Sequence, residues 1–196
     1  MSDTDYGVVL LAAGQGRRFG ADKRFARLGA QSVAETTLSR YLHVFERIAI
    51  VVRPEDHALR ELLVGPKVEF VEAPDAGLGM GHSLSAAFVN MSWEYAFVAL
   101  MDMPYVEEAT LRQLIASARA HAWRKIIRPQ LCNGPGGHPI GWPSHYFGPI
   151  SRSRGDQGAR ELLKSEAANT VWVNVEDNGI IKDIDRPGDL TEQHET

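Results

Sequence analysis

The stretch Gly14–Lys23, GQGRRFGADK, combines glycines with positive charges directly after an apolar run. Glycines let consecutive backbone N–H groups turn inward on an anion, and Arg17, Arg18 and Lys23 add full positive charges. The combination predicts a loop that binds a polyphosphate through its backbone and its cations. The alternative is a solvated turn that is basic by chance.

Two better-known glycine loops fit this stretch less well. A dinucleotide-binding turn, G-x-G-x-x-G, matches at Gly14 and Gly16, but Phe19 occupies the third glycine position, where a helix must pack closely on a strand. The next expected strand ends in Arg53 instead of the acidic residue that would bind a ribose. The Gly-Lys-Ser/Thr of a P-loop does not occur in the sequence. A broader phosphate loop is therefore favoured over a nicotinamide-dependent oxidoreductase.

A second candidate is Asp102 in ALMDMPYV, which follows a run of strand residues and precedes Pro104. A charged residue at the carboxyl end of a central strand lies at the ligand crevice of an α/β sheet. Carboxylates are also the ligands that Mg²⁺ accepts beside substrate phosphates. We expect Asp102 in the site, with the capping of the following helix as the alternative.

Four further segments carry candidate residues. In GLGMGHSLSAAF, glycines precede Ser83, which is expected to open a helix; such a loop can lie against a planar base, or be a plain turn with an N-cap. His138 lies in the Gly- and Pro-rich segment NGPGGHPIGW and is a candidate site residue. The alternative is a histidine in a turn that only hydrogen-bonds to the backbone. Asp156 is placed to cap the next helix. Asp183 and Asp185 lie two apart, on one face if the chain is extended.

The apolar patterns predict the elements that position these residues. Strands are expected at 6–12, 47–53, 67–73 and 95–102, and helices at 32–45, 56–63, 83–91 and 107–122. Ser32 and Glu35 form a capping box. Alternating strands and helices predict a parallel sheet covered on both faces, with ligands beyond the carboxyl ends of the strands.

The pattern loosens after residue 125. Strands are expected near 125–130, 170–175 and 179–184, a turn with a short strand at 133–142, and a helix at 158–167. We assign one domain over 1–196, with an NTP-binding half at about 6–105 and an acceptor-binding half at about 106–190 that forms a substrate lobe on the sheet.

Composition narrows the class of protein. The chain has 196 residues, is 44% hydrophobic and has a net charge of −4, which argues against general nucleic-acid binding. Its one cysteine, Cys132, cannot form an internal disulfide or a thiolate metal cluster, and a buried thiol is the default expectation. A polar N-terminus and the lack of a long apolar run predict a cytoplasmic protein with no membrane span.

The opening run resembles that of nucleotidyltransferases that activate small phosphorylated or sugar-like substrates with NTPs. It is similar in particular to the molybdenum cofactor cytidylyltransferases and to relatives like molybdopterin guanylyltransferase. Their motif has Leu-Ala-Ala-Gly or Leu-Ala-Gly-Gly, then Arg-Met-Gly and a downstream lysine; here Phe19 replaces Met, and Gly16 stands where Ser is common. Five later segments match in order, GLGMGHSL, ALMDMP, GGHPI, GDQGARELL and KDIDRPGDL, so that the resemblance covers residues 7 to about 190.

The resemblance implies a three-layer, Rossmann-like nucleotide-diphospho-sugar transferase fold with a mostly parallel central sheet. It implies catalytic roles for Arg18, Lys23 and Asp102, Mg²⁺ on Asp102 and Asp185, and acceptor contacts for His138 and Asp156. The residues expected around the nucleotide are Leu11, Ala12, Ala13, Gly14, Gly16, Arg17, Lys23, Gly79, Gly81 and Ser83. Gly136 stands where the family pattern often has Arg, which leaves the identity of the acceptor open.

The implied reaction is a transfer of CMP from CTP to molybdopterin with release of pyrophosphate. Ala13 is typical of the cytidylyl branch, whereas Gly at this position is typical of the guanylyl branch. Three aromatic residues, Trp142, Tyr146 and Phe147, are expected in the core or around a flat pterin. The alternatives are a sister transferase that uses GTP or another NTP, the oxidoreductase, and a nucleotide sensor or cofactor chaperone that kept the fold.

Overall fold

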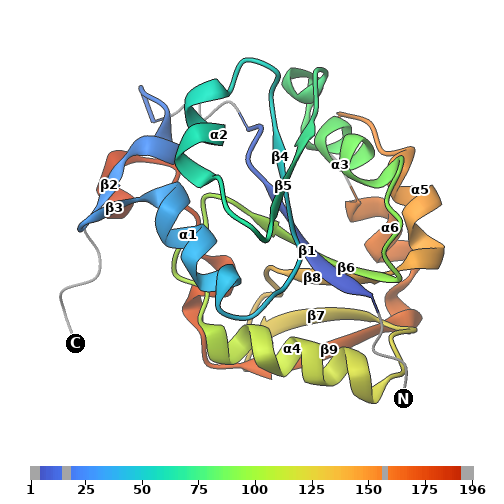
Figure 1. Ribbon diagram of the computed structural model, residues 1–196. Coiled ribbons are helices and arrows are strands. Elements are labelled where there is room, and N and C mark those ends of the chain that lie inside the picture. The colour runs from blue at the N-terminus through green and yellow to red at the C-terminus, as the bar shows by residue number, and fades with distance from the viewer. Residues whose placement is uncertain (1–4, 15–18, 156–158, 191–196) are drawn as a thin grey trace.

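The structure is a computed structural model that describes residues 5–14, 19–155 and 159–190 (Figure 1). Seven strands form one sheet in the order β5-β4-β1-β6-β8-β7-β9, and only β8 runs antiparallel to its neighbours. The strands are β1 Tyr6–Leu11, β4 Ile48–Val52, β5 Val68–Glu72, β6 Tyr95–Leu100, β7 Ile126–Leu131, β8 Ile140–Pro143 and β9 Thr170–Val175. A separate hairpin pairs β2 Arg27–Leu28 with β3 Gln31–Ser32.

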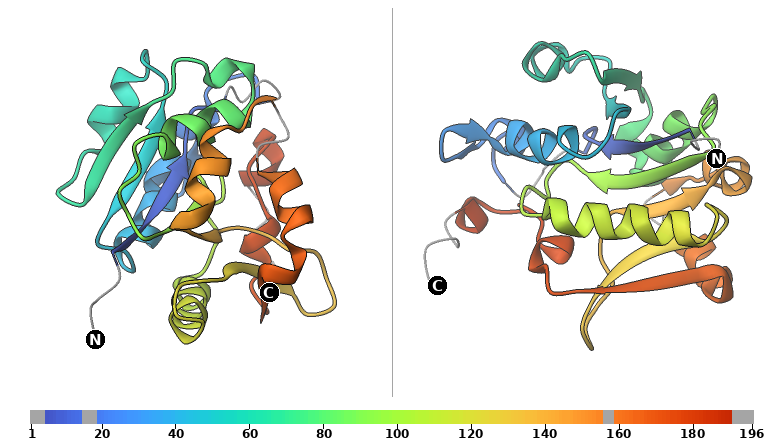
Figure 2. Two further views of the ribbon diagram at one scale, coloured as in Figure 1. Left: turned by 90° about the vertical axis from the view of Figure 1, so that its right-hand side faces the viewer. Right: turned by 60° about the horizontal axis from the view of Figure 1, so that its bottom comes forward.

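Helices cover both faces of the sheet, as Figures 1 and 2 show. One face carries α1 Val33–Leu42, α2 His57–Leu63 and α4 Glu108–Ala120, and the other carries α3 Met80–Phe88, α5 Phe147–Ser151 and α6 Arg160–Ser165. The apolar run of β1 follows from this arrangement: Val8 and Leu10 pack toward the first group, and Val9 and Leu11 toward the second. The predicted three-layer α/β fold with a mostly parallel sheet is confirmed.

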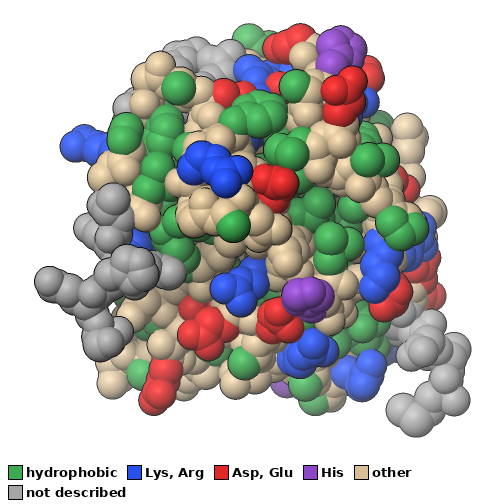
Figure 3. Space-filling view, turned by 60° about the vertical axis from the view of Figure 1, so that its left-hand side comes forward, with side chains coloured by type: hydrophobic (Ala, Val, Ile, Leu, Met, Phe, Trp, Pro, Cys, Tyr) green, Lys and Arg blue, Asp and Glu red, His purple; other side chains and the backbone are tan. Residues whose placement is uncertain are grey.

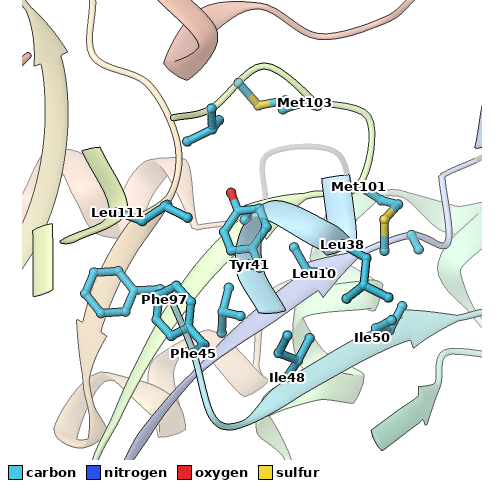
Figure 4. Packing of buried hydrophobic residues seen from close by; sticks show 14 of the residues in the cluster. Leu10, Leu38, Tyr41, Phe45, Ile48, Ile50, Phe97, Met101, Met103 and Leu111 are labelled. Atoms are coloured by element: carbon cyan, nitrogen blue, oxygen red, sulfur yellow. The ribbon is translucent and has the colours of Figure 1, made fainter. Parts of the chain in front are cut away.

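The core on the α1 face is rich in aromatic side chains. Figure 4 shows Tyr41 of α1 and Phe45 just beyond it among apolar side chains of the central strands. The rings of Phe45 and Phe97 meet edge to face at 5.6 Å. The Ser32–Glu35 capping box is present at the start of α1, as the sequence predicts. These contacts fix α1 beside β1 and β6, the two strands that end at the candidate site.

Four expectations about the structure are wrong. Cys132, expected to be a buried thiol, is exposed because it lies in the turn after β7. The helix expected from Ser83 begins at Met80, because Gly79 adopts φ 121° and starts the helix there, so that Ser83 lies within it. The strand expected at 179–184 is instead a 3₁₀ helix, η6 Asn178–Ile181, because the Asp177 side chain accepts the Gly179 N–H and closes a turn. The second half adds β7, β8 and β9 to the central sheet instead of forming a lobe upon it.

The described surface is mixed in charge where Figure 3 shows it. Acidic and basic side chains are interspersed on the side turned toward the viewer there, which includes the hairpin side of the molecule. Across the described ranges, no helix is both long enough and apolar enough to span a bilayer.

Candidate active site

The candidate site lies where β1 and β6 end side by side. The two strands are parallel neighbours with Leu11 opposite Leu100, and the Met101 N–H donates to the Leu11 carbonyl at 3.1 Å. The chain then leaves β1 toward β4 and leaves β6 toward the opposite half of the sheet, so that the sheet order reverses between them. Ligands of open α/β sheets bind at such a point.

Lys23 and Asp102 meet at this point. Lys23 opens a short 3₁₀ helix, η1 Lys23–Phe25, after the opening loop, and Asp102 follows β6. The ammonium Nζ lies 2.6 Å from Asp102 Oδ2 and 2.9 Å from Asp185 Oδ1, with the Lys23 side chain largely buried. Burial alone would lower the pKa of Lys23, but Asp102 and Asp185 together raise it, so the group is a firmly held cation.

A backbone hydrogen bond brings the C-terminal carboxylates to Asp102. The Ile184 N–H donates to the Asp102 carbonyl at 2.8 Å, and the Ile184 side chain is fully buried. Its two neighbours, Asp183 and Asp185, therefore face the same side as Asp102. Carboxylate oxygens of these three residues lie within 4.8 Å of one another. The sequence favoured Asp185 of this pair; the structure adds Asp183.

The three carboxylates form a donor set suited to a hard divalent cation such as Mg²⁺. Burial raises the pKa of Asp183, and the charges of Asp102 and Asp185 raise it further. Set against the single ammonium of Lys23, the carboxylates leave an excess of negative charge. A divalent cation would relieve this repulsion, so the residues fit the metal that the sequence predicts.

Arg24 fixes the beginning of the opening loop. Its guanidinium is buried and donates to the Ala12 carbonyl at 2.8 Å and to both Asp56 oxygens at 2.7 and 2.6 Å. Burial acts against its charge, but hydrogen bonds to Asp22 and Asp56 raise the pKa of Arg24. Sequence reasoning missed this residue, because its partners lie far apart in the chain.

The described residues predicted to contact the nucleotide, apart from Lys23, lie at the end of β1 or at the start of α3. Leu11, Ala12 and Ala13 are buried at the end of β1, and Gly14 is exposed beyond them. Gly81 and Ser83 are buried on α3; a Cβ at Gly81 would lie 2.7 Å from the Arg154 backbone, which explains the glycine by packing. Gly79 provides the turn into α3. Gly16, Arg17 and Arg18 lie outside the described residues, as does Asp156, so their roles stay predictions.

His138 lies on the acceptor half next to the carboxylates. It lines a pocket of about 350 Å³ together with Gly136, Gly137 and Asp183. Burial lowers the pKa of His138 to about 4, so the imidazole is neutral at pH 7. Its Nδ1 lies 3.5 Å from the Val98 carbonyl, which only accepts, so this nitrogen carries the proton. A contact of the neutral ring with the acceptor stays a prediction.

A larger cavity of about 670 Å³ adjoins this pocket through Leu100 and His138, which line both. The aromatic residues Trp142, Tyr146 and Phe147 are buried in the core behind it, and of the three only Trp142 lines it. Two further lining residues, Arg128 and Trp172, were not predicted from the sequence. The period-two pattern of TVWVNV was the available signal for Trp172, since it places this side chain opposite the valines of its strand. KIIRPQ, with two adjacent isoleucines, gave no such signal for Arg128.

Known proteins share this sequence pattern and this fold. The chain is 28% identical over 192 residues to "Purine catabolism protein PucB" of Bacillus subtilis, covering 91% of each chain. It is 31% identical over 99 residues to a "Probable molybdenum cofactor guanylyltransferase" of Peptoclostridium acidaminophilum, covering 50% of this chain and 42% of that one. The crystal structure of Rv0371c from Mycobacterium tuberculosis H37Rv superposes with a TM-score of 0.80 at 26% identity over 96% of each chain.

The family comparison agrees with the topology of the fold. Residues 8–171 match the model of the MobA-like NTP transferase domain, a span that includes the opening loop, Lys23, Asp102 and His138. The seven-stranded, mostly parallel sheet is that of the Rossmann-like nucleotide-diphospho-sugar transferases. The chain therefore belongs to the MobA-like NTP transferase family.

Proposed function

We propose that this protein is a molybdenum cofactor cytidylyltransferase, which transfers CMP from CTP to molybdopterin and releases pyrophosphate. The observation that carries the proposal is the cluster of Lys23, Asp102 and Asp185 at the switch point of the sheet, with ammonium-to-carboxylate distances of 2.6 and 2.9 Å. One cation and several carboxylates beside a glycine-rich loop are what a polyphosphate and its metal require.

Each residue of the cluster has a task in the proposed reaction. A phosphate oxygen of the acceptor attacks the α-phosphorus of CTP, the bond from that phosphorus to the β-phosphate bridge oxygen breaks, and pyrophosphate leaves with the electron pair. Lys23 and the loop backbone hold the triphosphate and the leaving pyrophosphate in position. Asp102 and Asp185, with Asp183 beside them, would hold Mg²⁺, which supplies Lewis-acid stabilisation of the phosphate charge when bound.

The choice of CTP over GTP rests on Ala13. The family resemblance associates Ala at this position with cytidylyl transfer, and Ala13 is fully buried directly before Gly14. A residue with a Cβ restricts the backbone at the start of the opening loop more than glycine would. The relative that is named as a guanylyltransferase makes GTP the principal alternative nucleotide.

The test is an assay of pyrophosphate release with each of the four NTPs, Mg²⁺ and molybdopterin. We expect release with CTP and a product whose mass equals molybdopterin plus CMP. Release with GTP in place of CTP would overturn the nucleotide assignment. Release with another phosphorylated acceptor but not with molybdopterin would overturn the acceptor assignment, and no release with any NTP would overturn the proposed transfer.

A further inference from the structure

The cavity behind the transfer site is positively charged, although the chain as a whole is acidic. Arg128, Arg160 and Lys164 line it, and among its described lining residues there is no carboxylate. The remaining walls are mostly apolar, from β1, β6, β8, α3 and α6. A cavity of about 670 Å³ with these walls fits a flat ring system that lies with its faces against apolar side chains and carries an anionic group.

Arg128 is held in this cavity by its neighbour on the next strand. Strands β7 and β9 pair in parallel with Arg128 directly opposite Trp172, which places both side chains on the same face of the sheet. The guanidinium carbon lies 4.9 Å from the centre of the Trp172 ring, a cation–π contact. Stacking leaves the edges of the guanidinium available for an anion.

The hydrogen-bonding capacity of Arg128 is incompletely used. Its Nε is buried and has no hydrogen-bond partner within the described part of the chain, and its Nη2 makes one long bond of 3.4 Å to the Gly136 carbonyl. No described carboxylate pairs with it, in contrast to Lys23 and Arg24. A half-buried cation without an anion is costly, so the site is suited to receive one.

Gly136 makes the stacked pair possible. A Cβ at this position would overlap the Trp172 ring and lie 3.0 Å from Arg128 Nε. This is the position where the family resemblance leads one to expect Arg. In this chain the positive charge is instead carried by Arg128 on β7, and the missing side chain at Gly136 leaves room for the guanidinium and the Trp172 ring.

We propose that Arg128, stacked on Trp172, binds an anionic group of the acceptor distinct from the phosphate that attacks CTP, and so selects flat acceptors that carry such a group. The inference rests on the proposed function for the pterin nature of that acceptor. The cavity adjoins the carboxylates through His138, so an acceptor anchored on Arg128 lies next to the site of transfer.

The test measures binding without turnover. Equilibrium dialysis of the full chain against 6-carboxypterin and against 6-methylpterin compares a flat anion with its uncharged analogue. For the wild type we expect tighter binding of the anion. Arg128→Gln should weaken binding of 6-carboxypterin about tenfold and change that of 6-methylpterin less than twofold. Arg128→Lys keeps the charge but not the planar guanidinium, so its affinity for 6-carboxypterin should lie between that of the wild type and that of Arg128→Gln.

The matched control is Arg124→Gln, which removes an exposed cation from the loop after α4, and it should leave both affinities unchanged. If Arg128→Gln leaves the ratio of the two affinities at its wild-type value, or if the wild type binds neither pterin, the inference is overturned. Pyrophosphate release from CTP tests the proposed function separately, since dialysis requires neither nucleotide nor transfer. If Arg128→Gln does not fold, Arg128→Lys tests the same inference, with a smaller expected loss of affinity for 6-carboxypterin.

Discussion

The two ends of the candidate site differ in how their cationic side chains are held. At the end of β1 and β6, Lys23 contacts Asp102 and Asp185, and Arg24 nearby is bonded to Asp22 and Asp56. Within β7 and β9, Arg128 is stacked on Trp172 and has no carboxylate partner among the described residues. In the first region these cations are already paired with carboxylates before any ligand arrives, whereas in the second Arg128 is not.

This difference affects how each cation can bind an anionic ligand. A paired cation must exchange its carboxylates for phosphates when substrate binds, so binding at the nucleotide end is a competition between two sets of anions. A cation that is stacked on an aromatic ring has no bound carboxylate to displace, so an incoming anion does not lose binding energy to that competition. The predictions below test this contrast, from the largest expected effect to the smallest.

Arg24 should be the most costly cation to remove. Arg24→Met takes a buried guanidinium from Asp56 and from the Ala12 carbonyl. Among the residues that the structure describes, Asp56 then keeps only Arg53 as a cationic partner. We expect the free energy of unfolding, measured with urea, to fall by about 3–4 kcal/mol. The control is Arg112→Met on exposed α4, for which about 0.5 kcal/mol or less is expected. Equal losses in the two variants would show that Arg24 is not the structural cation we describe.

Lys23→Met should separate metal binding from turnover. Loss of the ammonium removes a phosphate ligand, so pyrophosphate release with CTP should fall about a hundredfold. Without nucleotide, however, the variant should bind Mn²⁺ roughly tenfold more tightly, because no cation competes for Asp102 and Asp185. Electron paramagnetic resonance of free Mn²⁺ measures the affinity. Weaker Mn²⁺ binding in Lys23→Met would contradict the metal assignment, and Asp102→Asn, which should weaken it, is the control.

His138 should make the fold sensitive to acid. Burial lowers its pKa to about 4, whereas an unfolded histidine takes up a proton near its usual pKa of 6.5. Protonation of the unfolded state therefore removes stability as the pH falls through this window, by about 2 kcal/mol between pH 7.5 and pH 5. In His138→Asn this contribution is absent, while the carboxylates titrate as before. The measurement is the free energy of unfolding in urea, determined for the wild type and for His138→Asn at each pH. If the difference between the two proteins does not change with pH, His138 is not held neutral.

The nucleotide end of the site was largely predictable from the sequence, because each residue there follows from one local rule. Lys23 belongs to a glycine-rich loop after a strand, and Asp102 ends a buried strand, so the sheet edge brings them together. Their contact at 2.6 Å shows that the two side chains meet at the same edge of the sheet. The catalytic and binding roles assigned to them stay predictions.

The acceptor end was not predictable in the same way, because its contacts depend on strand register. Arg128 and Trp172 become partners only once β7 and β9 pair in parallel, and neither residue carries a motif of its own. Gly136 was recognised in the sequence only as a departure from the family pattern. The space it leaves, and the side chain that uses this space, could be found only in three dimensions.

Gly136→Ala should loosen the Arg128–Trp172 stack with the smallest of these effects. The added methyl group overlaps the Trp172 ring and crowds Arg128 Nε, so the pair must shift at a cost of about 1–2 kcal/mol in stability. We expect the KM for the acceptor to rise about threefold and the KM for CTP to stay unchanged. Gly148→Ala is the control, since its Cβ would meet its nearest neighbour at an ordinary 3.8 Å. Because both substitutions act on one stack, Gly136→Ala should add nothing to the acceptor KM of Arg128→Gln. Additive effects would mean that Gly136 acts on the acceptor by a route that does not involve Arg128.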